Sequence, residues 1–129
     1  MSSERVFVSL KVDTLSIVPR LDGDILRVAM SGAVEMRDPG DALNPYWTHI
    51  DEEALRRNLK TVELDVTDLN FMNSSGILTL VRWITRCKSH SNGYRLVLLY
   101  DRNVTWQRAS IPTLAKLAPN VVVSAEIDG

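Results

Sequence analysis

Two adjacent serines, Ser74 and Ser75, are the side chains of this sequence best placed to carry chemistry, because a serine hydroxyl can accept a phosphoryl group. They stand between Asn73 and Gly76. Asn73 can cap a helix by accepting a hydrogen bond from a backbone amide two or three residues further on. Ser74 would then hold the first helical position, beside unpaired N–H groups that favour a negative group. A phosphate there would bring a charge of about −2 to the positive end of the helix.

The same four residues also fit a helix start with no further role, because Asn-Ser-Ser-Gly is good capping chemistry. Spacing alone therefore leaves both interpretations open. No lysine or arginine lies within five residues of Ser74 in the sequence. We therefore expect a phosphate on Ser74 to repel a partner from a flat contact surface rather than to dock on an internal arginine.

Patterns typical of catalysis or metal binding are weak elsewhere in the chain. His49 and His90 are the only histidines, and neither accompanies a glycine-flanked nucleophile or a second ligand at metal spacing. Gly76 is the only glycine in its turn, so no glycine-rich loop can hold phosphates. Cys87 falls on the apolar stripe of a helix, as a small core residue would. We predict a protein that is not an enzyme, with no catalytic residue, metal site or cofactor.

The elements that position the serines follow from periodicity. Val62, Leu64 and Val66 alternate with polar residues, which predicts a strand with one buried face and helices on one side of the sheet. Residues 68–72 form a predicted loop. Apolar residues at offsets of three and four then predict a helix over residues 74–87.

The rest of the chain predicts the order β-β-β-α-β-α-β-α-β. Further strands are expected at residues 6–12, 15–21, 25–31, 96–100 and 121–127. We expect Gly32 to end the third strand, Asn44 and Pro45 to begin the first helix, and Pro112 to interrupt the last. Because helices alternate with strands after an opening hairpin, the fold class is α/β, a mixed β-sheet with helices packed on one face.

Length and composition exclude several classes of protein. The chain has 129 residues, 45% of them hydrophobic and 24% charged, and residues 1–129 are predicted to form a single domain. A net charge of −1 gives no attraction to nucleic acid or an anionic membrane. The longest apolar run, residues 96–100, is too short to cross a bilayer. A single cysteine fits the reducing cytoplasm. We therefore expect no nucleic-acid partner and no membrane partner.

The strand, residues 68–72 and the helix start resemble the STAS domain, the family of bacterial anti-sigma factor antagonists and of the cytoplasmic tails of sulfate transporters. The family pattern is an apolar strand, a loop ending Phe-Met/Ile-Asp-Ser-Ser/Thr-Gly, and an amphipathic helix. This chain has Phe71-Met72-Asn73-Ser74-Ser75-Gly76 in the same place. The predicted element order fits the family over nearly the whole chain.

The resemblance implies a cytoplasmic signalling protein that switches partners. In the family, a serine kinase phosphorylates the serine after the motif Asp, and this kinase is often the anti-sigma factor itself, of the histidine-kinase-like ATPase type. A PP2C-type phosphatase removes the phosphate. The matching position is Ser74, with Ser75 as the second candidate and Asn73 and Gly76 as the helix cap beside them.

Candidate partner contacts follow in the same way. The resemblance places the loop of Gly32, Ala33, Val34 and Glu35 beside the phosphoserine, and Met72 adjoins it. Trp83 falls partly off the apolar stripe of its helix, so it is a further candidate contact, although the same position suits an aromatic that covers the edge of the core.

The chain departs from the family in ways that indicate a divergent subgroup. Asn73 replaces the usual Asp, which keeps the cap but removes a carboxylate beside Ser74. Residues 6–12 add a strand. An alternative function is therefore a STAS-fold module that is not phosphorylated and binds a protein or small ligand constitutively, with Asn73 marking a lost switch.

Overall fold

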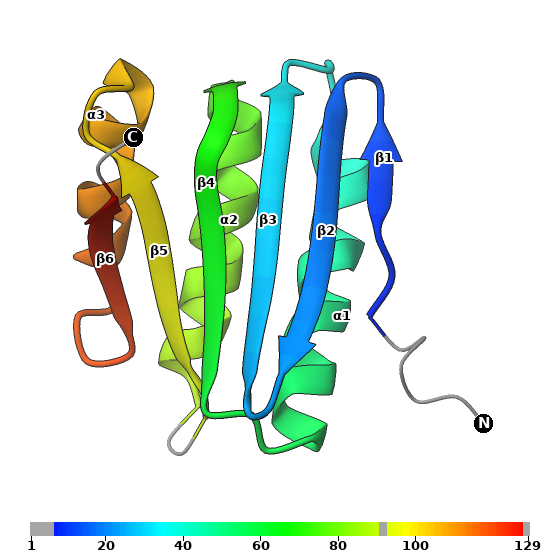
Figure 1. Cartoon of the computed structure of the whole chain (residues 1–129), viewed down its shortest axis with the longest axis vertical. Helices are drawn as coiled ribbons and strands as arrows, with labels where there is room; N and C mark the ends of the chain where they lie inside the picture. Colours follow the sequence, from blue (N-terminus) through cyan, green and yellow to red (C-terminus); the bar gives the residue numbers. More distant parts are fainter. Residues whose placement is uncertain (1–6, 91–92, 128–129) are drawn as a thin grey trace.

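The computed structural model describes residues 7–90 and 93–127 (Figure 1). The elements follow the predicted β-β-β-α-β-α-β-α-β order. They are β1 (Leu10–Val12), β2 (Leu15–Asp22), β3 (Ile25–Val34), α1 (Gly40–Arg56), β4 (Thr61–Met72), α2 (Ser74–Lys88), β5 (Arg95–Asp101), α3 (Thr105–Ala115) and β6 (Val122–Ile127).

The six strands form one mixed sheet in the order β1-β2-β3-β4-β5-β6. The first two pairings are antiparallel and the remaining three are parallel. Each parallel step is connected by one helix, and Figure 1 shows the helices behind the sheet, on one face. The predicted fold class is confirmed. Within the described ranges, none of the helices is long and apolar enough to cross a membrane.

The core lies between the sheet and the helices. Val62, Leu64 and Val66 of β4 are fully buried, whereas Glu63 and Asp65 point to the open face of the sheet and are half-buried. This alternation is the one that the sequence predicts for a strand covered on one side. Helix residues that meet this face include Ile50, Leu80, Ile84 and Ile111.

Two strands continue past their predicted ends. β4 extends through residues 68–72, where a loop was predicted, because β3 runs on beside it as far as Val34. Gly32 does not end β3; it has φ of +86° and lies where the register between β3 and β4 shifts. A Cβ at Gly32 would overlap the carbonyl oxygen of Thr14 in the β1–β2 turn. Gly32 therefore lets a neighbouring backbone approach the strand closely.

Three other predicted boundaries were wrong. The helix α1 begins at Gly40 after Pro39, and Pro45 lies inside it on an exposed position. Burial of Leu43 offsets the one backbone hydrogen bond that Pro45 lacks. The helix α3 continues through Pro112 in the same way, held by buried side chains on both sides of it. Of the strand predicted at residues 6–12, only Leu10–Val12 forms a strand, and residue 6 lies outside the described residues.

A buried polar network joins α1, α2 and the start of β5. Asp51 is 1% exposed, and its carboxylate accepts a hydrogen bond of 2.6 Å from the Tyr94 hydroxyl. That hydroxyl in turn accepts from Trp83 Nε1 at 2.7 Å and from Cys87 Sγ at 3.3 Å. His90 Nε2 lies 3.1 Å from the same carboxylate. Burial raises the pKa of Cys87 from 9.0 to about 12 and raises that of Tyr94 as well.

Cys87 is therefore expected to react with iodoacetamide at least about 100-fold more slowly in the folded protein than in urea at pH 8, because the thiolate is the nucleophile. Because folding raises the pKa of Cys87, the protonated thiol contributes to the free energy of unfolding below pH 9. This contribution is lost as the pH rises towards 12. Mass spectrometry of alkylated protein over time measures the rate. Equal rates in folded and unfolded protein would contradict the buried position.

Candidate functional site

The candidate site is the corner where β4 ends and α2 begins. Asn73 is the N-cap of α2, with extended backbone at φ −72° and ψ 169°. Its side-chain oxygen accepts a hydrogen bond of 2.8 Å from the backbone amide of Gly76. Ser74 is therefore the first residue of the helix, at the end that carries partial positive charge.

Asn73 also ties this corner to the segment that follows β3. Its backbone amide donates to the carbonyl of Val34 at 2.9 Å, and its Nδ2 donates to the carbonyl of Met36 at 3.0 Å. A carboxylate at this position can cap the helix but cannot donate to Met36. Asparagine at this position therefore makes one more hydrogen bond than aspartate would.

Replacing Asn73 with aspartate is expected to lower the free energy of unfolding by about 1 kcal/mol, because the donor to Met36 is lost while the cap remains. Alanine, which loses the cap too, is expected to cost about 2 kcal/mol. Urea unfolding followed by tryptophan fluorescence measures both. If aspartate proved more stable than asparagine by more than the gain of about 0.3–1 kcal/mol from a negative charge at a helix N-terminus, the hydrogen bond to Met36 would contribute nothing to stability.

Both serines are exposed, and neither hydroxyl makes a hydrogen bond within the described part of the chain. One large apolar side chain is exposed next to them: Leu78 is 48% exposed. Residues three or four apart on a helix share a face, so Ser74, Ser75 and Leu78 are neighbours. We call Ser74, Ser75 and Leu78 the Ser74 surface.

Leu78 is not among the contact residues predicted from the sequence. A signal for it was present, because Leu78 falls off the apolar stripe formed by Ile77, Leu80 and Ile84 and is still large and apolar. An exposed apolar residue next to a modifiable hydroxyl is typical of a protein contact.

Several residues predicted to contact a partner are buried beneath the start of α2. Val34 and Met72 are 0% and 3% exposed, so their side chains are not available to a partner. Gly76 is buried between them: a Cβ there would lie 2.8 Å from Val34 Cγ1 and 2.9 Å from Met72 Cγ. Of the other predicted contacts, Gly32 and Ala33 are half-buried and Glu35 is exposed.

Trp83, offered as a partner contact, is buried. It is 2% exposed and its ring stacks on Trp47 of α1, with centroids 4.7 Å apart and planes 13° from parallel. Trp47 Nε1 donates to Thr79 of α2 at 3.0 Å. The buried face of α2 is wider than its predicted stripe because α2 packs on α1 as well as on the sheet.

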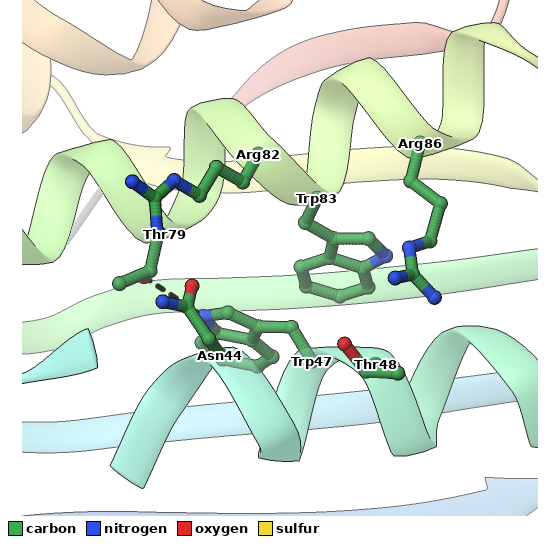
Figure 2. Close-up of a pocket in the computed structure, with 7 residues that line it drawn as sticks. All are labelled: Asn44, Trp47, Thr48, Thr79, Arg82, Trp83 and Arg86. Atoms are coloured by element: carbon green, nitrogen blue, oxygen red, sulfur yellow. Dashed lines mark hydrogen bonds between the residues drawn. The ribbon is translucent and has the colours of Figure 1, made fainter. Parts of the chain in front are cut away.

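A groove between α1 and α2 opens beside the serines. Its first part, of about 260 Å³, is lined by Ser75 and Leu78 together with Arg37, Asp38, Pro39, Gly40, Asp41, Asn44, Thr79 and Arg82. The second part, of about 150 Å³, shares Asn44, Thr79 and Arg82 and continues to Arg86 (Figure 2). Sequence distance from Ser74 did not reveal these arginines, because the fold brings Arg37 to the groove from another segment.

No set of side chains typical of catalysis accompanies the serines. His90 and Asp51 form a pair, but they lie at the C-terminal end of α2, while the serines lie at its N-terminal end. In residues 7–90 and 93–127, no group of three His, Cys, Asp or Glu side chains could hold a metal ion. The site thus offers exposed hydroxyls on a partly apolar surface.

Comparison with known proteins gives no match to a family model and none to a curated protein. Among solved structures, an anti-sigma factor antagonist from Mycobacterium paratuberculosis is similar with a TM-score of 0.62 at 15% identity, over 88% of this chain and 90% of that chain. A chain from the structure of diguanylate cyclase SiaD in complex with its activator SiaC from Pseudomonas aeruginosa is similar with a TM-score of 0.66 at 14% identity, over 93% of this chain and 99% of that chain. A Shewanella loihica protein with a SpoIIAA-like fold is similar with a TM-score of 0.52 at 14% identity, over 92% of this chain and 90% of that chain. At these identities the likeness concerns the fold: this chain has the SpoIIAA-like, STAS-type fold of anti-sigma factor antagonists.

Proposed function

We propose that this chain is a non-catalytic, cytoplasmic signalling protein that switches protein partners through phosphorylation of Ser74. A serine kinase of the histidine-kinase-like ATPase type adds the phosphate and a PP2C-type phosphatase removes it. The observation that carries the proposal is the placement of Ser74, exposed and without a hydrogen bond at the first position of α2, on one helix face with Leu78.

The chemistry of that surface supports a switch. Unmodified, it combines an apolar side chain with uncharged hydroxyls, which a partner can cover at a much lower desolvation cost than a charged group. A phosphate on Ser74 adds a charge of about −2 that a partner would have to bury or avoid. Two of the structural neighbours are consistent with this use of the fold, since one is an anti-sigma factor antagonist and the other an activator found in complex with an enzyme.

The aspartate variant S74D tests the proposal. Its Kd for a candidate kinase, encoded near this chain in the genome, is expected to rise at least about tenfold. Its thermal stability is expected to stay equal or to rise, because a negative charge at the first helical position is favourable by about 0.3–1 kcal/mol. Calorimetry measures the affinity and the melting temperature separately, so weaker binding is not mistaken for unfolding.

The matched control is T113D, which adds the same charge at an exposed position of α3. It is expected to leave the Kd unchanged. Equal affinities for S74D, T113D and the parent chain would contradict the switch and favour a constitutive binding module.

A further inference from the structure

The two adjacent serines face different surroundings. Ser75 lines the groove between α1 and α2 together with Arg37 and Arg82, whereas Ser74 is not among the residues of that groove. Figure 2 shows the side chain of Arg82 running back along α2 past Thr79, towards the end of the helix where the serines lie. The groove therefore opens next to one hydroxyl of the pair.

Helix geometry explains the difference. Arg82 follows Ser75 by seven residues, which is about 20° short of two full turns, so both side chains lie on one line along the helix. The rise between them is about 10 Å, and helical side chains lean towards the N-terminus, as that of Arg82 does. Ser74 is eight residues from Arg82 and lies about 80° round the helix.

The two guanidinium groups in the groove have no partner among the described residues. Arg37 and Arg82 make no ion pair or hydrogen bond within the described ranges. Asp38 and Asp41 line the same groove and disfavour a free anion there. A phosphate tethered to Ser75 loses less entropy on binding in the groove than a free phosphate does, so attraction to the two arginines can outweigh repulsion by the two aspartates.

We propose that the groove between Arg37 and Arg82 receives a phosphoryl group carried by Ser75. The Ser75 hydroxyl oxygen attacks the γ-phosphorus of ATP held by a protein kinase, the bond to ADP breaks, and the hydroxyl proton passes to a base of the kinase. The resulting phosphoserine docks between the two arginines and ties residues 37–41 to α2. The inference rests on the proposed function only in that a kinase must reach this corner. A phosphate on Ser74 projects to the partner, while one on Ser75 is held within the chain.

The full chain with phosphoserine encoded at position 75 tests the proposal without any partner, so it can fail independently of the switch at Ser74. A ³¹P NMR titration gives the second pKa of the phosphate, which is about 6 when free. We expect R82Q to raise this pKa by at least about 0.5 unit, because an opposite charge favours the dianion. K88Q, the matched change at an exposed lysine of the same helix, is expected to leave it within about 0.1 unit.

Two further arms separate the alternatives. In a chain with phosphoserine at position 74, R82Q is expected to leave the phosphate pKa unchanged. Inorganic phosphate, titrated into the unmodified protein, is expected to show no saturable binding below about 10 mM. An R82Q effect below 0.1 unit at position 75, an equal effect at position 74, or tighter binding of inorganic phosphate that depends on Arg82 would each overturn the assignment.

Discussion

Replacing Gly32 with alanine is expected to lower the free energy of unfolding by about 4 kcal/mol, the largest effect that we predict for a single methyl group. Gly32 has φ of +86°, a left-handed conformation that costs a residue with a Cβ about 1–2 kcal/mol. The added methyl would also overlap the carbonyl oxygen of Thr14, which belongs to backbone and cannot rotate away. Both terms act on the β1–β2 turn and on β3, which leads to the site.

The matched control is G23A. Gly23 also has a positive φ, of +64°, but a Cβ there would meet no atom within 4 Å. Its expected cost is about 1 kcal/mol, from conformation alone. Urea unfolding of both variants gives the difference. If the two substitutions had equal effects, the close approach of Thr14 to β3 would not be the reason for glycine at position 32.

Replacing Asp51 with alanine is expected to cost about 3 kcal/mol, the second largest effect. The carboxylate is 1% exposed and is the acceptor of the Tyr94 hydroxyl at 2.6 Å. It also accepts from His90 and lies 3.8 Å from Arg86. Its removal leaves the buried Tyr94 hydroxyl without an acceptor and opens space between α1 and α2.

The neighbouring carboxylate Glu52 provides the comparison, because it is exposed on the same helix. E52A is expected to change the free energy of unfolding by less than about 0.5 kcal/mol. Chemical unfolding followed at two wavelengths compares the variants. A loss below 1 kcal/mol for D51A would mean that the network of Tyr94, Trp83 and Cys87 keeps its bonds without the carboxylate.

Hydrophobic periodicity and turn-forming residues were sufficient to predict the element order, the mixed sheet and the helices on one face. The alternation of Val62, Leu64 and Val66 with polar residues is a local pattern. It predicts the strand correctly because only one face of the sheet is buried. Errors arose where tertiary contacts overrode local chemistry. The sequence predicts a strand end at Gly32, where glycine instead allows the close approach of Thr14. It also predicts a helix start at Pro45, whereas packing extends α1 on both sides of this residue.

The candidate site was also predictable only where its features are local. The cap at Asn73 and the helix start at Ser74 depend on four adjacent residues, so they could be predicted from the sequence. The burial of Trp83 depends on its stacking with Trp47 of α1, so the sequence left its role open between a partner contact and a core position, and the structure places it in the core. Arg37 and Arg82 line one groove beside Ser75 only because the segment between β3 and α1 packs beside α2, and no sequence spacing connects Arg37 with α2.

The most direct measurement of the central claim compares one affinity before and after one modification. The chain is incubated with its kinase and ATP, the phosphate is located by mass spectrometry, and the Kd for that kinase is measured before phosphorylation, after it, and after a PP2C phosphatase has acted. We predict phosphorylation of Ser74, a Kd raised at least about tenfold, and recovery of the original value after dephosphorylation. A chain that carries the phosphate on Ser74 and binds its partner with unchanged affinity would contradict the proposal.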